Sequence, residues 1–231
     1  MGSPPTVLIT GAGAPGITGT IHALRNNPSG ELPRIIGCDL RSDAVGQALV
    51  DEFFTVPPPE ADNYLESLIG LCHEHRVDVV LPQTTREVEH LAVLGEEVRG
   101  AGVALVTGEA GAVRRGNDKA ETLEAFESAG LATPRWSLAG SAQQVTELAV
   151  EFGYPNVEVV IKPPRGNGMR GFRVLSAHSG RYEAFVSSKP GDARVTLEEF
   201  ITVLATANDV ELLVTEYLPG VDRKSTRLNS S

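Results

Sequence analysis

The stretch VEVVIKPPRGNGMRGFRVL, residues 157–175, decides the fold of this 231-residue chain. Two runs of apolar and β-branched residues, 157–162 and 172–175, stand on either side of a loop, and no helix-forming run separates them. The loop contains three glycines, Gly166, Gly168 and Gly171. Glycine leaves a backbone free to approach a ligand closely. The stretch therefore predicts a β-hairpin with a flexible loop that can lie over a chain of phosphates.

Basic side chains accompany this glycine loop. Lys162 ends the first strand, so that a compact ammonium group stands on a base fixed by the sheet. Arg165 and Arg170 add positive charge within the loop. These side chains indicate a site for the phosphates of a nucleotide.

A later strand pattern suits the base of that nucleotide. The run ELLVTEYLPG, residues 211–220, is an apolar strand that ends in Glu216, Tyr217 and Leu218. A carboxylate oxygen can accept a hydrogen bond from the exocyclic amine of adenine, and the peptide groups that follow can face the edge of the ring. The run therefore predicts recognition of adenine.

The N-terminal stretch VLITGAGAPGITG, residues 7–19, contains a different glycine loop. A strand-compatible run leads into Gly11, Gly13 and Gly16, and a helix-compatible run follows. Asp39 ends a second strand, RIIGCD. Taken alone, this arrangement is the fingerprint of a Rossmann unit that binds NAD. A bare turn without a ligand, or a loop that faces the substrate of another class of enzyme, are the alternatives.

The rest of the first hundred residues alternates strands with helices, as expected of an α/β fold with a parallel sheet. We expect strands at 6–10, 34–39, 52–56, 77–82 and 102–108, and helices at 17–26, 61–76 and 86–100. Arg86, Glu87 and Glu89 are expected on a solvated helix face. Beyond residue 116, helices at 117–130, capped by Asn117 or Asp118, and at 141–152 precede the hairpin.

Three of these stretches, in this order, resemble the ATP-grasp superfamily, and in particular the branch that is similar to the carbamoyl-phosphate synthase large chain. They are NDKAETLEAFESAGLATP at 117–134, GYPNVEVVIKPPRGNGMRGFRVL at 153–175 and TEYLPG at 215–220. The resemblance extends over nearly all of residues 6–222. It implies a Rossmann-like pre-ATP-grasp domain with a parallel sheet, followed by the small α+β lobe of an ATP-grasp fold.

The resemblance also implies roles for single residues. Lys119 and Lys162 are the lysines that contact phosphate, and the loop from Arg165 to Gly171 covers the phosphates. Glu216 accepts from the adenine amine with Tyr217 and Leu218 at the hinge, and Asp222 stands where such proteins carry an acidic ribose contact. The loop of Gly11, Gly13 and Gly16 then faces the acceptor substrate and does not bind NAD. The resemblance also implies that the stretch QTTRE, residues 83–87, lies near the cleft, as an alternative to the solvated helix face.

Domain boundaries follow from the same comparison of motifs. We expect a Rossmann-like N-terminal domain at 1–107 and a partial ATP-grasp domain at 108–222. Residues 223–231, RKSTRLNSS, break the preceding pattern and are expected to be an appended, non-native tail. The half of the superfamily fold that carries the magnesium ligands would follow the run at 211–220. We therefore expect no metal ligands here, and a strand at 211–220 with an open, aggregation-prone edge.

These expectations combine into one function. The sequence is interpreted as the ATP-binding portion of an ATP-dependent carboxylate–amine ligase that acts through an acyl phosphate, with ATP, Mg²⁺ and a small carboxylate substrate as partners. An NAD(P)-dependent oxidoreductase is one alternative, but no nicotinamide pocket or catalytic acid or base is evident. A non-catalytic nucleotide-binding module is the other.

Composition excludes some classes of partner. The formal net charge of −10 and the pI near 5.0 argue against nucleic acid and anionic membrane surfaces, which both need basic protein surface. No apolar run approaches the roughly 20 residues that span a bilayer, so a cytoplasmic protein is expected. Cys38 and Cys72 lack paired spacing and are expected to be reduced thiols in the core.

Overall fold

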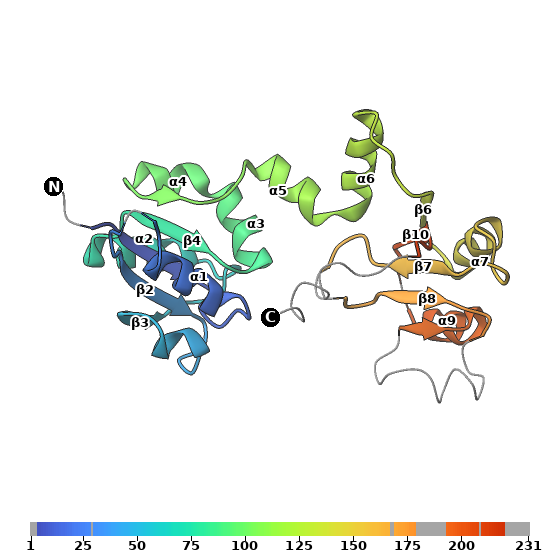
Figure 1. Cartoon of the computed structure of the whole chain (residues 1–231), viewed down its shortest axis with the longest axis horizontal. Helices are drawn as coiled ribbons and strands as arrows, with labels where there is room; N and C mark the ends of the chain where they lie inside the picture. The colour runs from blue at the N-terminus through green and yellow to red at the C-terminus, as the bar shows by residue number, and fades with distance from the viewer. Residues whose placement is uncertain (1–3, 29, 167–168, 179–192, 208, 220–231) are drawn as a thin grey trace. The chain divides into compact units, whose positions relative to one another are not determined.

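The computed structural model describes residues 4–28, 30–166, 169–178, 193–207 and 209–219. The chain divides into two compact units, Met1–Arg114 and Arg115–Ser231 (Figure 1). No helix within the described ranges is long and apolar enough to cross a membrane.

The first unit is built on a parallel sheet of five strands in the order β3-β2-β1-β4-β5. The strands are β1 (Thr6–Thr10), β2 (Arg34–Asp39), β3 (Glu52–Thr55), β4 (Val79–Pro82) and β5 (Ala104–Leu105). The connections hold the helices α1 (Ile17–Arg25), α2 (Tyr64–His75), α3 (Thr85–Val93) and α4 (Gly95–Gly100) and the 3-10 helix η1 (Val45–Ala48). The α/β class expected from the alternating pattern is confirmed.

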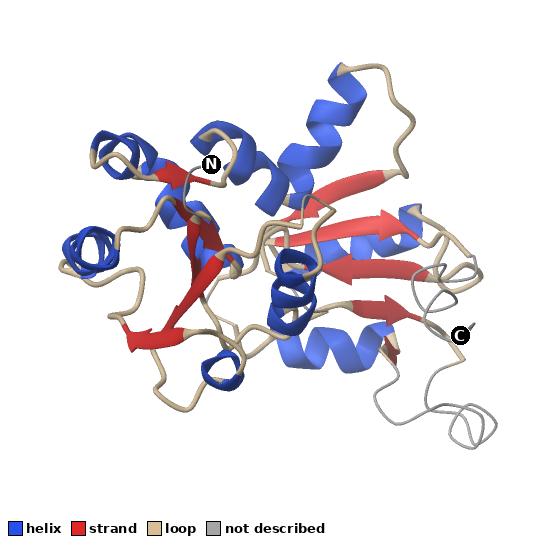
Figure 2. Ribbon diagram, turned by 60° about the vertical axis from the view of Figure 1, so that its left-hand side comes forward, coloured by secondary structure: helices blue, strands red, loops and turns tan. Residues whose placement is uncertain are grey.

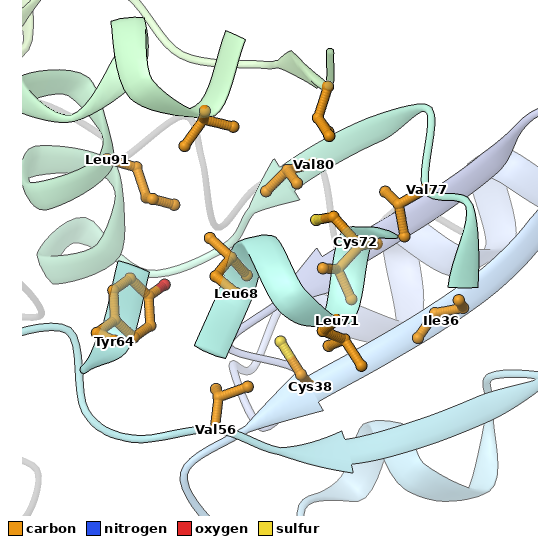
Figure 3. Packing of buried hydrophobic residues seen from close by; sticks show 13 residues of the cluster. Ile36, Cys38, Val56, Tyr64, Leu68, Leu71, Cys72, Val77, Val80 and Leu91 are labelled. Carbon is orange, nitrogen blue, oxygen red and sulfur yellow. The ribbon is translucent and has the colours of Figure 1, made fainter. Parts of the chain in front are cut away.

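Two apolar cores cover the two faces of this sheet, because alternate residues of a strand point to opposite sides. One core contains Leu8 with side chains of α2, α3 and α4. The other contains Val7 and Ile9 with side chains of α1. Figure 3 shows part of the first core, with both cysteines inside it; neither forms a disulfide, and burial raises the pKa of the Cys38 thiol.

The helix expected at 86–100 is two helices in the structure. Leu94 leaves the helical conformation, with φ −89° and ψ 16°, and the chain bends before α4. Leu91 of α3 and Val98 of α4 both lie in the same core, where each is at most 1% exposed.

The second unit contains a mixed sheet of five strands in the order β6-β10-β7-β8-β9, which lie side by side in Figure 2. The strands are β6 (Trp136–Ala139), β7 (Val159–Lys162), β8 (Arg173–Leu175), β9 (Arg194–Val195) and β10 (Leu212–Glu216). All neighbours are antiparallel except β8 and β9. The core of this unit lies between the sheet and the helices α7 (Ala142–Glu151) and α9 (Leu197–Leu204).

Two further helices, α5 (Ala110–Asn117) and α6 (Lys119–Ser128), lie between the two sheets in the sequence. Asp118 caps α6 by accepting hydrogen bonds from the N–H groups of Ala120 at 2.9 Å and Glu121 at 3.1 Å. Ser141 caps α7 by accepting a hydrogen bond from the N–H of Gln144 at 3.2 Å.

The expectation that β10 has an open edge is wrong. This strand pairs with β6 on one side and β7 on the other, and Leu213, Val214 and Thr215 are all buried. One of these partners, β6, joins the sheet from more than seventy positions earlier in the chain. The residue pattern of either strand alone does not predict which strand will lie beside it in the sheet.

Candidate functional site

The glycine loop of residues 163–172 connects two paired strands, as expected. β7 and β8 are antiparallel, with Val159 opposite Leu175 and Ile161 opposite Arg173. Val159 and Ile161 are fully buried and anchor the hairpin in the core. The hairpin thus fixes the backbone at Lys162, where the loop begins.

Glycine is required at two described positions of this loop. Gly166 has φ +125° and Gly171 has φ +73°, conformations that side chains rarely adopt. A Cβ atom on Gly171 would also lie 2.6 Å from Cγ of Pro163. Gly168, the third glycine of the loop, lies outside the described residues.

Lys119 joins the start of this loop from the first residue of α6. Its ammonium group donates hydrogen bonds to the carbonyl oxygens of Pro163 and Pro164, both at 3.2 Å, and of Gly166 at 2.8 Å. Its backbone N–H also donates to the carbonyl of Pro164 at 2.9 Å. The two lysines expected at the phosphates therefore belong to one region of the second unit.

The ammonium groups influence each other there. Burial lowers the pKa of Lys162, and the positive charge of Lys119 lowers it further. Two like charges held together favour a ligand that carries negative charge. This is the electrostatic character that a phosphate site needs.

Arg165 was expected to add positive charge for the phosphates, but in the structure it pairs with acidic side chains at the start of α6. Its Nε donates to Oδ2 of Asp118 at 3.0 Å, and its guanidinium lies 3.8 Å from Glu121. Burial alone would raise the pKa of Asp118, but the hydrogen bonds from Arg165 and from the N–H groups at the start of α6 hold that pKa below its ordinary value. In the structure Arg165 thus ties the loop to the start of α6.

The end of β10 carries the residues expected at the base. Oε1 of Glu216 accepts a hydrogen bond from the backbone N–H of Arg135 at 2.9 Å, and Oε2 lies 3.7 Å from the Arg135 guanidinium. Tyr217 is half-buried and Leu218 is 66% exposed. Asp222, the expected ribose contact, lies outside the described residues. Arg135 was not singled out by the sequence.

The N-terminal glycine loop is stabilised by its own strands. Asp39 accepts hydrogen bonds from the backbone N–H of Gly13 at 2.8 Å and of Arg41 at 3.0 Å. Gly11 has φ +61°, and a Cβ atom there would overlap Oε2 of Glu87. Gly16 precedes α1 and is exposed, and a Cβ atom there would meet no other atom within 4 Å, so space does not exclude a side chain.

A small pocket of about 130 Å³ lies beside this loop in the first unit. It is lined by Gly11, Asp39, Leu40, Val56, Pro57, Pro59, Thr84, Arg86 and Glu87.

Glu87 does not lie on a solvated face, so that expectation is wrong. It is 5% exposed and accepts a hydrogen bond from the hydroxyl of Thr84 at 2.7 Å. Burial raises its pKa, and the charge of Asp39 raises it further. The sequence signal was the pattern Thr-x-x-Glu of a capping box, which Thr84 and Glu87 fit.

Metal ligands were not expected in this chain. Within the ranges that the structure describes, no three His, Cys, Asp or Glu side chains come together as they would around a metal ion.

Known proteins share both the sequence pattern and the fold of this chain. Residues 7–106 match the family model described as PylC-like, N-terminal domain. Over 204 residues the chain is 31% identical to the formate-dependent phosphoribosylglycinamide formyltransferase of Prochlorococcus marinus, a match that covers 86% of this chain and 48% of that protein. Over 103 residues it is 35% identical to the carbamoyl phosphate synthase large chain of Thermus thermophilus, covering 43% of this chain and 10% of that one.

A solved structure shares the fold. The biotin carboxylase domain of the 2-oxoglutarate carboxylase of Hydrogenobacter thermophilus, in complex with MgADP, ADP and bicarbonate, aligns with a TM-score of 0.59 at 19% identity. The alignment covers 94% of this chain and 45% of that one. The chain thus spans about half the length of the formyltransferase and of this carboxylase domain.

Proposed function

We propose that this chain is the ATP-binding portion of an ATP-dependent carboxylate–amine ligase. Its sequence and fold match the N-terminal half of an ATP-grasp protein of the carbamoyl-phosphate synthase-like branch. The whole ligase would contain this chain and the remaining half that its relatives possess. The proposal covers the nucleotide, the metal and the class of reaction.

One observation carries the proposal: two ammonium groups lie at the start of one glycine loop. Lys162 ends a buried strand, and Lys119 is held to the loop by three carbonyl oxygens. The triphosphate of ATP is a strong polyanion, and ammonium groups bind phosphate oxygens through charge-assisted hydrogen bonds. An ammonium group has three N–H donors, so Lys119 would exchange at least one of its carbonyl partners for a phosphate oxygen when ATP binds. We assign both lysines to the phosphates, and the end of β10 at Glu216, Tyr217 and Leu218 to adenine.

The reaction would run in two steps. An oxygen of the substrate carboxylate attacks the γ-phosphorus of ATP, which forms an acyl phosphate and releases ADP. The nitrogen of the amine then attacks the acyl carbon, inorganic phosphate leaves, and the nitrogen loses a proton. Lys119 and Lys162 would hold and neutralise the phosphate oxygens during the first step.

Magnesium would neutralise charge on the transferred phosphoryl group. Because the described residues bring no metal-ligand set together, we assign its protein ligands to the half of the ligase that this chain does not span. Magnesium prefers carboxylate and phosphate oxygens, so ATP itself would supply part of its coordination.

The N-terminal glycine loop is assigned to the acceptor substrate. An NAD-binding Rossmann unit uses the acid at the end of its second strand for the ribose hydroxyls. Here that acid, Asp39, accepts hydrogen bonds from the backbone of Gly13 and Arg41 and so supports the loop itself. The oxidoreductase alternative is therefore the weaker one.

Replacement of Lys162 tests the assignment of the phosphates. We expect Lys162→Ala to weaken binding of ATP roughly 10- to 100-fold, as for loss of a hydrogen bond to a charged group. Binding of adenosine should stay within about twofold, because the nucleoside lacks the phosphates. Isothermal titration calorimetry with both ligands measures the difference.

Arg194→Ala is the matched control. Arg194 lies on β9, at the far edge of the same sheet, and forms an ion pair with Glu158 at 2.8 Å. This variant removes one positive charge but should leave both affinities unchanged. Equal weakening of ATP and adenosine by Lys162→Ala would contradict the assignment of Lys162 to the phosphates.

A further inference from the structure

Arg135 forms more contacts with the end of β10 than the pairing of two strands requires. The register places Thr215 opposite Trp136, so Glu216 and Arg135 are the next pair. The backbone N–H of Glu216 donates to the carbonyl of Arg135 at 2.9 Å, as in an antiparallel pair. The return hydrogen bond, from the Arg135 N–H, goes to the side chain of Glu216 at 2.9 Å.

This exchange fixes the Glu216 carboxylate at one oxygen. Oε1 takes the backbone N–H, and Oε2 stays free of that hydrogen bond at 3.7 Å from the Arg135 guanidinium. A carboxylate has several acceptor positions, so Oε2 can accept from another donor. The side chain is only 32% exposed and has little freedom to turn away.

The guanidinium of Arg135 is itself held in place. Its Nη2 donates to the carbonyl of Phe152 at 3.3 Å, and its central carbon lies 4.8 Å from the centre of the Phe152 ring. The cation–π contact and the hydrogen bond to the same residue favour this orientation of the guanidinium, although the Arg135 side chain is 56% exposed. Phe152 is buried in the core of the second unit, so this orientation is tied to the core.

We propose that Arg135 is a positioning residue that holds the Glu216 carboxylate ready for the 6-amino group of adenine and thereby selects adenine over 6-oxo purines. This inference rests on the proposed function, because it takes Glu216 to face the base. A carboxylate oxygen only accepts hydrogen bonds. A 6-oxo group also only accepts, so inosine would leave two acceptors opposed where adenosine makes a hydrogen bond.

How firmly the Glu216 carboxylate is held determines how strongly the site selects adenine over a 6-oxo purine. A carboxylate that can rotate away from a 6-oxo group avoids the repulsion and binds both bases with similar affinity. At Glu216 two contacts oppose that rotation: the Arg135 backbone N–H holds Oε1, and the Arg135 guanidinium attracts Oε2 from 3.7 Å. Arg135→Ala keeps the first contact and removes only the second, so it should reduce selection between bases more than it reduces binding of the phosphates.

The experiment compares ATP with ITP on the 231-residue chain. We expect the wild-type chain to bind ATP at least about tenfold more tightly than ITP. Arg135→Ala should reduce this ratio about three- to tenfold, mainly through weaker binding of ATP. Arg135→Lys, which keeps the charge but lacks the planar guanidinium, should give an intermediate ratio. Arg194→Ala is again the control and should keep the wild-type ratio.

Each possible result either supports or overturns the inference. A reduced ratio in Arg135→Ala supports the inference, and Arg135→Lys decides alone if the alanine variant does not fold. An unchanged ratio, or equal weakening of ATP and ITP, overturns the inference and leaves the proposed function standing. Failure of the folded wild-type chain to bind ATP overturns the proposed function, and the role of Arg135 with it.

Discussion

Gly11 lacks a side chain for two independent reasons. Its φ of +61° is unfavourable for other residues, and a Cβ atom would overlap the carboxylate of Glu87. Gly19 meets neither condition, because it lies inside α1 and a Cβ atom added there would meet nothing within 4 Å beyond its own helix backbone. The two glycines are near each other in the sequence, but only the position of Gly11 requires glycine.

Alanine at each position should show this difference. We expect Gly11→Ala to lower the free energy of unfolding by roughly 2 to 4 kcal/mol, the combined cost of a strained backbone and an overpacked site. Gly19→Ala should raise it by up to about 1 kcal/mol, since alanine favours a helix. Urea denaturation measures both. A Gly11→Ala chain as stable as the wild type would contradict the packing of Glu87 against this loop.

Glu87 is a second residue whose position has a measurable effect. Burial is the main cause that raises its pKa above the ordinary 4.5, and the charge of Asp39 adds to it. A carboxyl group with a raised pKa stabilises the fold fully below its unfolded pKa. That contribution is lost as the pH rises through the folded pKa.

Glu87→Gln should therefore change the pH dependence of stability. The amide is close in shape to the protonated acid and does not ionise, so wild type and variant should be similar below about pH 4.5. As the pH rises from there toward 7, the wild type should become progressively less stable than the variant. Thermal denaturation from pH 4 to pH 8 checks this, and a difference that is independent of pH would contradict it.

Among the elements, the helix α6 is the one whose first residues also hold the glycine loop, so the stability of the helix and the position of the loop depend on the same side chains. Its N-cap residue Asp118 accepts from two backbone N–H groups of the helix and from Arg165 of the loop. Lys119, the next residue, donates to three carbonyl oxygens of the same loop. A change at the start of α6 should thus affect both the helix and the loop.

Two substitutions of Asp118 separate these effects. Asp118→Ala removes the cap and the ion pair and should cost about 1 to 2 kcal/mol of stability. Asp118→Asn keeps a good N-cap and loses only the charge, so its cost should be below about 1 kcal/mol. Urea denaturation of both variants measures the two costs. Equal destabilisation by Asn and Ala would show that the charge, and not the cap, carries the effect.

The sequence predicted the elements better than their partners. The strands at Thr6–Thr10 and Arg34–Asp39 and the hairpin of β7 and β8 were evident because apolar runs and glycines are local signals. The position of β10 was not, because β6 reaches it from a distant part of the chain. The contacts of Arg135 were hidden for the same reason, since they depend on how two strand ends meet.

At the scale of the whole molecule, the chain spans about half the length of the formyltransferase that it resembles. The residues that we assign to ATP lie in its second unit, Arg115–Ser231. Our proposal places the magnesium ligands in the half of the ligase that this chain does not span, so it expects binding of nucleotide and turnover of nucleotide to be separable.

We expect the 231-residue chain to bind ATP weakly and to release no ADP above background in the presence of Mg²⁺ and amino acids, because phosphoryl transfer needs a held metal ion. A coupled assay for ADP measures this. A magnesium-dependent signal that is abolished by Lys162→Ala would show a complete catalytic site within this chain, contrary to our proposal.

The central place of β10 has a consequence for synthesis on the ribosome. The sheet of the first unit can form once Leu105 has emerged, because its five described strands have then all been made. In the second unit β6 and β7 cannot complete their pairing until the strand that lies between them, the last of the described strands along the chain, has been made. Such late, non-local pairing is slow and exposes strand edges meanwhile. The edges of β6 and β7 that face β10 therefore stay unpaired during synthesis until Glu216 has left the exit tunnel.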